Sequence, residues 1–153
     1  MIGLLQLVAG RAARAGNRRR AGTKTAAVPD PQQLRRLLLD PHLWQLWMPG
    51  VLDLAEQPRP PRPGARYRVR LRQRVGRLGF GGVAEGHVVI ECWGETAFAW
   101  QLVVAEHVER YALALDHASA TLTVDGGEDP AVALAQLLRE AAPLDAGAPP
   151  AAL

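Results

Sequence analysis

The stretch that decides the fold is Asp40-Pro41-His42-Leu43-Trp44-Gln45-Leu46-Trp47-Met48-Pro49-Gly50-Val51. It has the marks of one short helix, because Asp40 can cap the N-terminus, Pro41 fits the first helical position and Pro49-Gly50 stops the helix. Trp44 and Trp47 are three residues apart, so a helix of two turns points both indoles toward one side. Rings of this size need an apolar surface to cover them, and we expect a sheet formed downstream to provide it.

The residues before this stretch predict a strand and a first helix. The β-branched threonines favour a strand over Thr23–Val28. Asp30 and Pro31 then form a helix start of the same kind as Asp40 and Pro41, and three leucines at helical spacing give an apolar stripe that ends at Leu39.

The residues after this stretch alternate between apolar and polar, as in half-buried strands. Short links between the later strands, such as Trp93-Gly94-Glu95, require antiparallel neighbours. Four prolines in Gln57–Gly64 cannot join a ladder, so this segment is predicted as a loop. The predicted strands are Val51–Leu54, Arg66–Leu78, Val83–Trp93, Thr96–Ala105, Val108–Asp116 and Ser119–Val124, with a hairpin at Gly76–Gly82.

A final amphipathic helix follows the strands. Asp129 and Pro130 mark its start, apolar residues recur at i, i+3, i+4 and i+7 from Leu134, and Pro143 stops it. The predicted helix has about 13 residues, or roughly 20 Å.

This order of elements, together with the D-P-H-L-W-Q-L-W-M-P-G-V run, resembles the START-like or SRPBCC superfamily of polyketide cyclases, aromatases and lipid-transfer domains. The resemblance covers about residues 23–142. It implies an α+β helix-grip fold, in which a curved antiparallel sheet of about six or seven strands wraps around a C-terminal helix, with two short helices after the first strand. The predicted last helix is shorter than is usual in the superfamily, so it would cover less of a cavity.

Charge divides the chain. The first 29 residues carry six basic residues and no acid, which leaves 12 basic and 15 acidic residues for the rest. We expect residues 1–22 to be a poorly ordered basic arm, 23–142 the folded domain and 143–153 a disordered tail. The arm also resembles a transit peptide, and it has the charge to lie on an anionic membrane.

Composition excludes several classes of protein. The single Cys92 forms no internal disulfide and no cysteine-rich zinc site. No apolar run reaches the ~18 residues of a membrane span, and no dinucleotide, phosphate-loop or metal motif is present. The sequence therefore predicts a cytoplasmic domain without cofactor or metal, of unknown oligomeric state.

Five arginines alternate along the predicted strand 66–78, with Tyr67, Val69 and Leu71 on its other face. Closely spaced guanidinium groups favour phosphates, so this face is a candidate surface for an anionic membrane, and less so for nucleic acid. The alternative, which we favour, is that carboxylates of neighbouring strands, such as Glu85 and Glu91, neutralise the arginines.

No catalytic constellation is evident. Glu85 with His87, and His107 with Glu109, would share a strand face at i, i+2, which permits a proton-transfer pair. Exposed polar alternation explains these residues more simply. Cys92 is expected to be a small core residue rather than a thiolate.

A sheet bent around one helix tends to leave space between them, and a large void must be occupied or wet. We therefore expect binding of a hydrophobic small molecule such as a lipid, quinone or polyketide, with the Tyr67 and Tyr111 hydroxyls as polar anchors. The alternative is that the same side chains fill the core completely. A polyketide cyclase or aromatase is a second hypothesis, and an electrostatic module using the arm and the arginine strand is a third. The predicted lining residues are Trp47, Met48, Tyr67, Val69, Leu71, Val88, Ile90, Phe98, Trp100, Tyr111 and Leu113.

Overall fold

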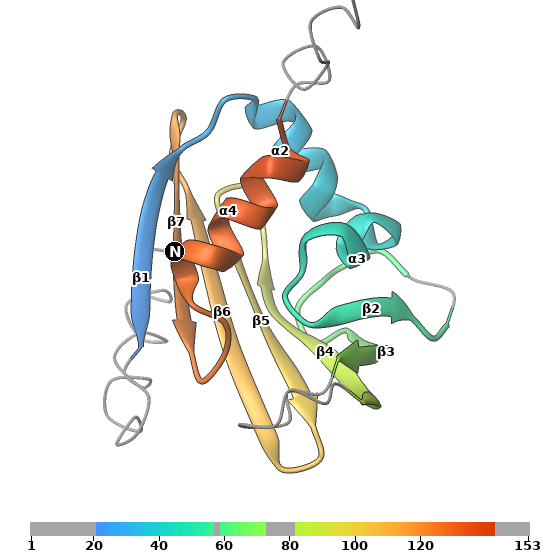
Figure 1. The fold of residues 1–153 in the computed structure, drawn as a ribbon. Coiled ribbons are helices and arrows are strands. Elements are labelled where there is room, and N and C mark those ends of the chain that lie inside the picture. Colours follow the sequence, from blue (N-terminus) through green and yellow to red (C-terminus); the bar gives the residue numbers. More distant parts are fainter. Residues whose placement is uncertain (1–20, 57–58, 73–81, 143–153) are drawn as a thin grey trace, which may run out of the picture.

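The computed structural model describes residues 21–56, 59–72 and 82–142. They form a seven-stranded sheet in the order β1-β7-β6-β5-β4-β3-β2, in which every neighbouring pair is antiparallel. The helices lie together on one side of the sheet, and α4 crosses in front of its β7 side (Figure 1). The predicted architecture, an antiparallel sheet with a C-terminal helix packed on it, is confirmed.

The strands match the alternating segments of the sequence to within a residue or two at their ends. The predicted strand 66–78 is described only to Arg72, and the hairpin predicted at 76–82 lies outside the described residues except for Gly82. The strands are β1 (Gly22–Ala27), β2 (Val51–Leu54), β3 (Arg66–Arg72), β4 (Val83–Trp93), β5 (Ala97–Val104), β6 (His107–Leu115) and β7 (Ser119–Asp125).

The helices are α2 (Pro31–Leu39), η1 (Pro41–Leu43), α3 (Trp44–Trp47) and α4 (Pro130–Glu140). The single helix predicted for the deciding stretch is wrong in detail, because it is one 3₁₀ turn followed by one α turn. Asp40 starts it as predicted, since its side chain accepts from the His42 N–H at 3.0 Å. A tight first turn is common at helix ends, and here the Trp44 N–H bonds to the Pro41 carbonyl.

The sheet separates an apolar face from a polar one. On β3 the arginines are exposed while Tyr67, Val69 and Leu71 are buried. The buried residues of the other strands continue this face and meet Leu134 and Leu137 of α4 in one core. Register shifts between Ile90 and Cys92 on β4, and between Val51 and Asp53 on β2, bend the sheet.

Candidate functional site

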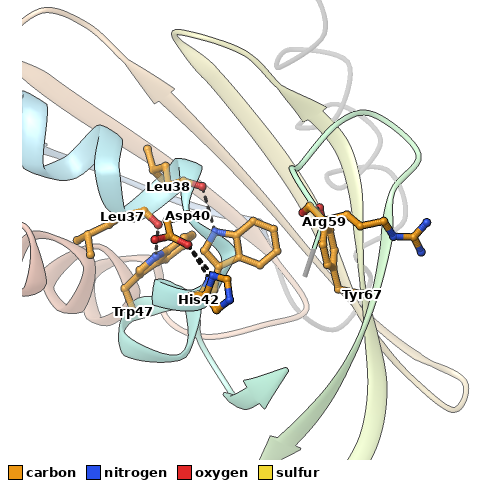
Figure 2. A network of polar contacts seen from close by, with 8 residues as sticks. Leu37, Leu38, Asp40, His42, Trp47, Arg59 and Tyr67 are labelled. Atoms are coloured by element: carbon orange, nitrogen blue, oxygen red, sulfur yellow. Dashed lines mark hydrogen bonds and ion pairs between the residues drawn. The ribbon is translucent and has the colours of Figure 1, made fainter. Parts of the chain in front are cut away.

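Three tryptophans close the C-terminal end of α2. The last carbonyls of a helix have no partner within it, and indole N–H groups supply partners here. Trp47 Nε1 donates to the Leu37 carbonyl at 2.9 Å, and Trp44 Nε1 donates to the Leu38 carbonyl at 3.0 Å. Trp93 Nε1, from β4, reaches the same Leu38 carbonyl at 3.1 Å. Figure 2 shows Trp47 directed at Leu37 in this way. The two indoles of the deciding stretch thus point to one side, as predicted.

The rings of these tryptophans join an aromatic cluster on the sheet. Trp44 packs edge-on against Tyr67, with ring centroids 5.0 Å apart, and Trp47 packs edge-on against Trp100 at 5.5 Å. Trp100 in turn stacks on Tyr111 at 5.3 Å. Every predicted lining residue is buried, with no more than 3% of its surface exposed.

A groove of about 410 Å³ opens beside this cluster, between the segment Gln45–Leu52 and α4. Trp47, Met48 and Val51 are its buried residues from the first wall. Leu46 and Val132, by contrast, expose 43% and 55% of their surface. The groove therefore offers exposed apolar surface next to a buried indole. Its lining residues are Gln45, Leu46, Trp47, Met48, Pro49, Gly50, Val51, Leu52, Arg72, Glu128, Val132, Ala133 and Gln136.

Of the predicted lining residues, Trp47 and Met48 line this groove. Tyr67 lines a different pocket, beside the proline-rich loop. The remaining predicted residues lie in the buried core: Val69, Leu71, Val88, Ile90, Phe98, Trp100, Tyr111 and Leu113. Sequence reasoning expected the C-terminal helix to border the cavity but named none of its residues. Val132, an apolar residue outside the leucine stripe of that helix, was an available signal.

Both tyrosine hydroxyls have partners in the protein. Tyr67 Oη donates to the Arg59 carbonyl at 2.7 Å. Burial raises the pKa of Tyr67, and the nearby charges of Arg59 and Arg62 oppose that rise. Tyr111 Oη donates to Glu109 Oε1 at 2.6 Å and accepts from the Glu128 N–H at 3.1 Å. The polar ends of these residues thus fix loops of the protein itself.

A polar chain runs along one face of β6. His107 Nε2 lies 3.3 Å from Glu109 Oε2, and Glu109 accepts from Tyr111 through its other oxygen. The geometry expected for the His107–Glu109 pair is therefore present, and it extends to Tyr111. Only 13% of the Glu109 side chain is exposed.

Trp100 carries the one buried side-chain polar atom without a partner in the described part of the chain. Its Nε1 has no hydrogen-bond acceptor, although the residue is only 1% exposed. A buried donor without an acceptor costs about 1–3 kcal/mol. The indole N–H of Trp100 is thus available to an acceptor that reaches it.

The arginine face of β3 is partly neutralised. Arg70 forms a two-pronged ion pair with Asp53 of β2, and this bond lowers the pKa of the Asp53 carboxyl. Glu85 and Glu91 of β4 were expected to pair with these arginines, and neither does so among the described residues. Glu91 instead accepts from the Gln101 side-chain amide, and no ion pair of Glu85 occurs among the described residues.

The remaining candidates for chemistry are few. Burial raises the pKa of the Cys92 thiol, whose Sγ contacts the Ala97 carbonyl at 3.6 Å. Within residues 21–56, 59–72 and 82–142, no three histidine, cysteine or acidic side chains gather as metal ligands. None of the helices in those ranges has the length and apolar character needed to cross a bilayer.

Several solved structures are similar to this one in fold. A protein from Chromobacterium violaceum gives a TM-score of 0.54 at 15% sequence identity, with 79% of this chain and 93% of that chain covered. A protein from Nitrosomonas europaea gives 0.52 at 15% identity, with the same coverage of 79% and 93%. The di-domain aromatase/cyclase StfQ from the steffimycin biosynthetic pathway gives 0.53 at 13% identity, with 90% of this chain and 55% of StfQ covered.

The chain has the helix-grip fold. The resemblance drawn from the sequence is confirmed at the level of the fold, since one of these neighbours is the aromatase/cyclase StfQ. At these identities the helix-grip likeness concerns the fold alone. No protein-family model and no curated protein matches the sequence.

Proposed function

We propose that this protein binds a hydrophobic small molecule, such as a lipid, quinone or polyketide, in the groove between Gln45–Leu52 and α4. The observation that carries the proposal is the groove itself, with about 410 Å³ of space and the exposed apolar side chains of Leu46 and Val132 at its mouth. Ligand sites usually enclose about 300–1,000 Å³ and combine apolar surface with a few polar groups, which Gln45, Arg72, Glu128 and Gln136 supply here. Covering exposed apolar surface contributes about 25 cal/mol per Å².

A ligand that displaces Trp47 would reach the predicted interior residues. Trp47 lies between the groove and Trp100, with the two ring centroids 5.5 Å apart. The unpaired Trp100 N–H would then find an acceptor in a ligand oxygen. A carbonyl or hydroxyl oxygen is common to lipids, quinones and polyketides, which supports this ligand class over a pure hydrocarbon.

The experiment is native mass spectrometry of freshly purified full-length protein. We expect added mass of a few hundred daltons at one molecule per chain. Val132→Glu places a charge at the groove mouth and should abolish the added mass. Val83→Glu is the matched control, because Val83 is an equally exposed valine, 58% against 55%, outside the groove. Equal retention of the compound by both variants would place it elsewhere.

A polyketide cyclase or aromatase is the second candidate, favoured by the His107–Glu109–Tyr111 chain. Glu128, whose N–H bonds to Tyr111, also lines the groove. An enzyme of this kind would lose turnover of a polyketide surrogate on Glu109→Gln or Tyr111→Phe. Unchanged product ratios in Tyr67→Phe and Tyr111→Phe would contradict an enzymatic role and retain only the ligand-binding role.

Two further expectations stay predictions. The predicted contact with anionic membranes uses the arm 1–22, of which residues 1–20 lie outside the described part of the chain. Deletion of the arm should weaken binding to anionic vesicles at low salt, and equal binding by the shortened protein would contradict the contact. A cytoplasmic location likewise stays a prediction.

A further inference from the structure

A second pocket, of about 400 Å³, lies where the proline-rich loop meets the start of β3. Three of its lining residues are arginines and none is acidic. The lining residues are Arg59, Pro60, Arg62, Pro63, Gly64, Ala65, Arg66 and Tyr67.

The backbone that carries Arg62 and Arg66 is held in place. The Ala65 N–H bonds to the Arg62 carbonyl at 3.0 Å, with Pro63 and Gly64 between them. Gly64 has a φ of +86°, which a type II turn requires at this position and which glycine adopts without strain. The Gly64 N–H then bonds to the Ile90 carbonyl of β4 at 2.7 Å, which attaches the turn to the sheet.

Arg59 is fixed from the other side of the pocket. The Tyr67 hydroxyl donates to its carbonyl at 2.7 Å, and the Tyr67 ring is itself fixed against Trp44. Figure 2 shows the Arg59 guanidinium extending away from Trp47 and the other residues drawn there. The loop therefore presents its arginines from an ordered backbone, which reduces the entropy lost when they bind a ligand.

Among the described residues, these guanidinium groups have no carboxylate partner. In the described ranges no ion pair involves Arg59, Arg62 or Arg66, whereas Arg70, on the same strand, pairs with Asp53. Asp40, which lies with Arg59 around a neighbouring hollow, is hydrogen-bonded to His42. Each arginine thus keeps its planar set of N–H donors free for an external anion.

We propose that this pocket binds a phosphate group through Arg59, Arg62 and Arg66. A phosphate carries up to two negative charges and several acceptor oxygens, which suits three guanidinium groups better than a single carboxylate does. The phosphate belongs to a soluble phosphorylated compound or to the head group of an anionic lipid. This site is separate from the apolar groove and does not depend on its function.

The test follows the arginine Nε–Hε signals of full-length protein by NMR during titration with inorganic phosphate and pyrophosphate at low salt. A parallel test measures flotation with phosphatidylcholine vesicles, with and without phosphatidic acid. The variant is Arg62→Ala/Arg66→Ala, and the matched control is Arg35→Ala/Arg68→Ala. The control removes the same charge, one arginine on β3 and one outside it, at exposed residues that line neither this pocket nor the apolar groove.

We expect saturable binding that the Arg62→Ala/Arg66→Ala variant weakens by at least about tenfold and the control by less than about threefold. Binding of the free anions identifies a soluble source, and binding to phosphatidic acid vesicles alone identifies a lipid head group. No saturable binding in either test, or an equal loss in the control, overturns the site, because general positive charge would then explain the data.

Discussion

At the scale of single residues, the polar atom of each tryptophan distinguishes its role. The N–H groups of Trp44, Trp47 and Trp93 donate hydrogen bonds to the last carbonyls of α2. The N–H of Trp100 has no acceptor in the described part of the chain. The sequence predicted that two indoles share one side of a short helix. It could not predict their acceptors, because Trp93 meets a carbonyl 55 residues away.

This difference predicts unequal costs for two otherwise similar substitutions. Trp47→Phe leaves the Leu37 carbonyl without its indole partner. Trp100→Phe removes a donor that has no acceptor among the described residues. We expect Trp47→Phe to lower the free energy of unfolding by about 1–3 kcal/mol more than Trp100→Phe. Urea denaturation of both variants measures the difference, and equal losses would show that the Trp100 N–H is bonded.

Gly127 makes a second prediction at this scale. A Cβ at this position would lie 2.8 Å from Tyr111 Cζ and 2.9 Å from Glu109 Oε1. Gly127→Ala must therefore displace the Tyr111 ring, at a cost of about 1–3 kcal/mol in the free energy of unfolding. In the double variant with Tyr111→Phe the costs should be less than additive, since both disturb the same bond. Additive costs would mean that the two residues do not interact.

At the scale of elements, the order of strands and helices was predictable because its signals are local. The alternation of apolar and polar residues predicted β3 to β7, and the Asp-Pro pairs predicted where α2, η1 and α4 begin. The contacts between segments far apart in the sequence have no such local signal. The loop over 57–64 was expected only as a solvated connection, yet its Arg62–Ala65 turn is bonded to β4 and its Arg59 carbonyl to Tyr67. The partner of Arg70 was sought on β4 and lies on β2.

The pairing of β2 with β3 should depend on pH. Arg70 lowers the pKa of Asp53 below its ordinary value of 3.8. A carboxyl with a lowered folded pKa stabilises the fold above its unfolded pKa, and this contribution is lost as the pH falls through the folded pKa. We expect Asp53→Asn, and equally Arg70→Ala, to flatten the loss of stability below about pH 4. Thermal melts between pH 2 and 6 test this, and an unchanged acid slope in both variants would contradict it.

At the scale of the whole molecule, the site was only partly predictable. The resemblance gave the helix-grip fold, and it directed attention to the space between the sheet and α4. The groove lies at the edge of that space, where Trp47 and Met48 meet Val132 and Gln136. Its position depends on how α4 docks beside α3, and no pattern within either helix specifies that contact.

The most direct test of the groove is an equilibrium titration of full-length protein with an uncharged fluorescent apolar probe, N-phenyl-1-naphthylamine. Its lack of charge keeps it from the arginine pocket. We expect one saturable site, weakened at least about tenfold by Leu46→Glu or Val132→Glu and unchanged by Val83→Glu. Absence of saturable binding, or the same affinity in all of these variants, would contradict the assignment of the groove as a site for hydrophobic ligands.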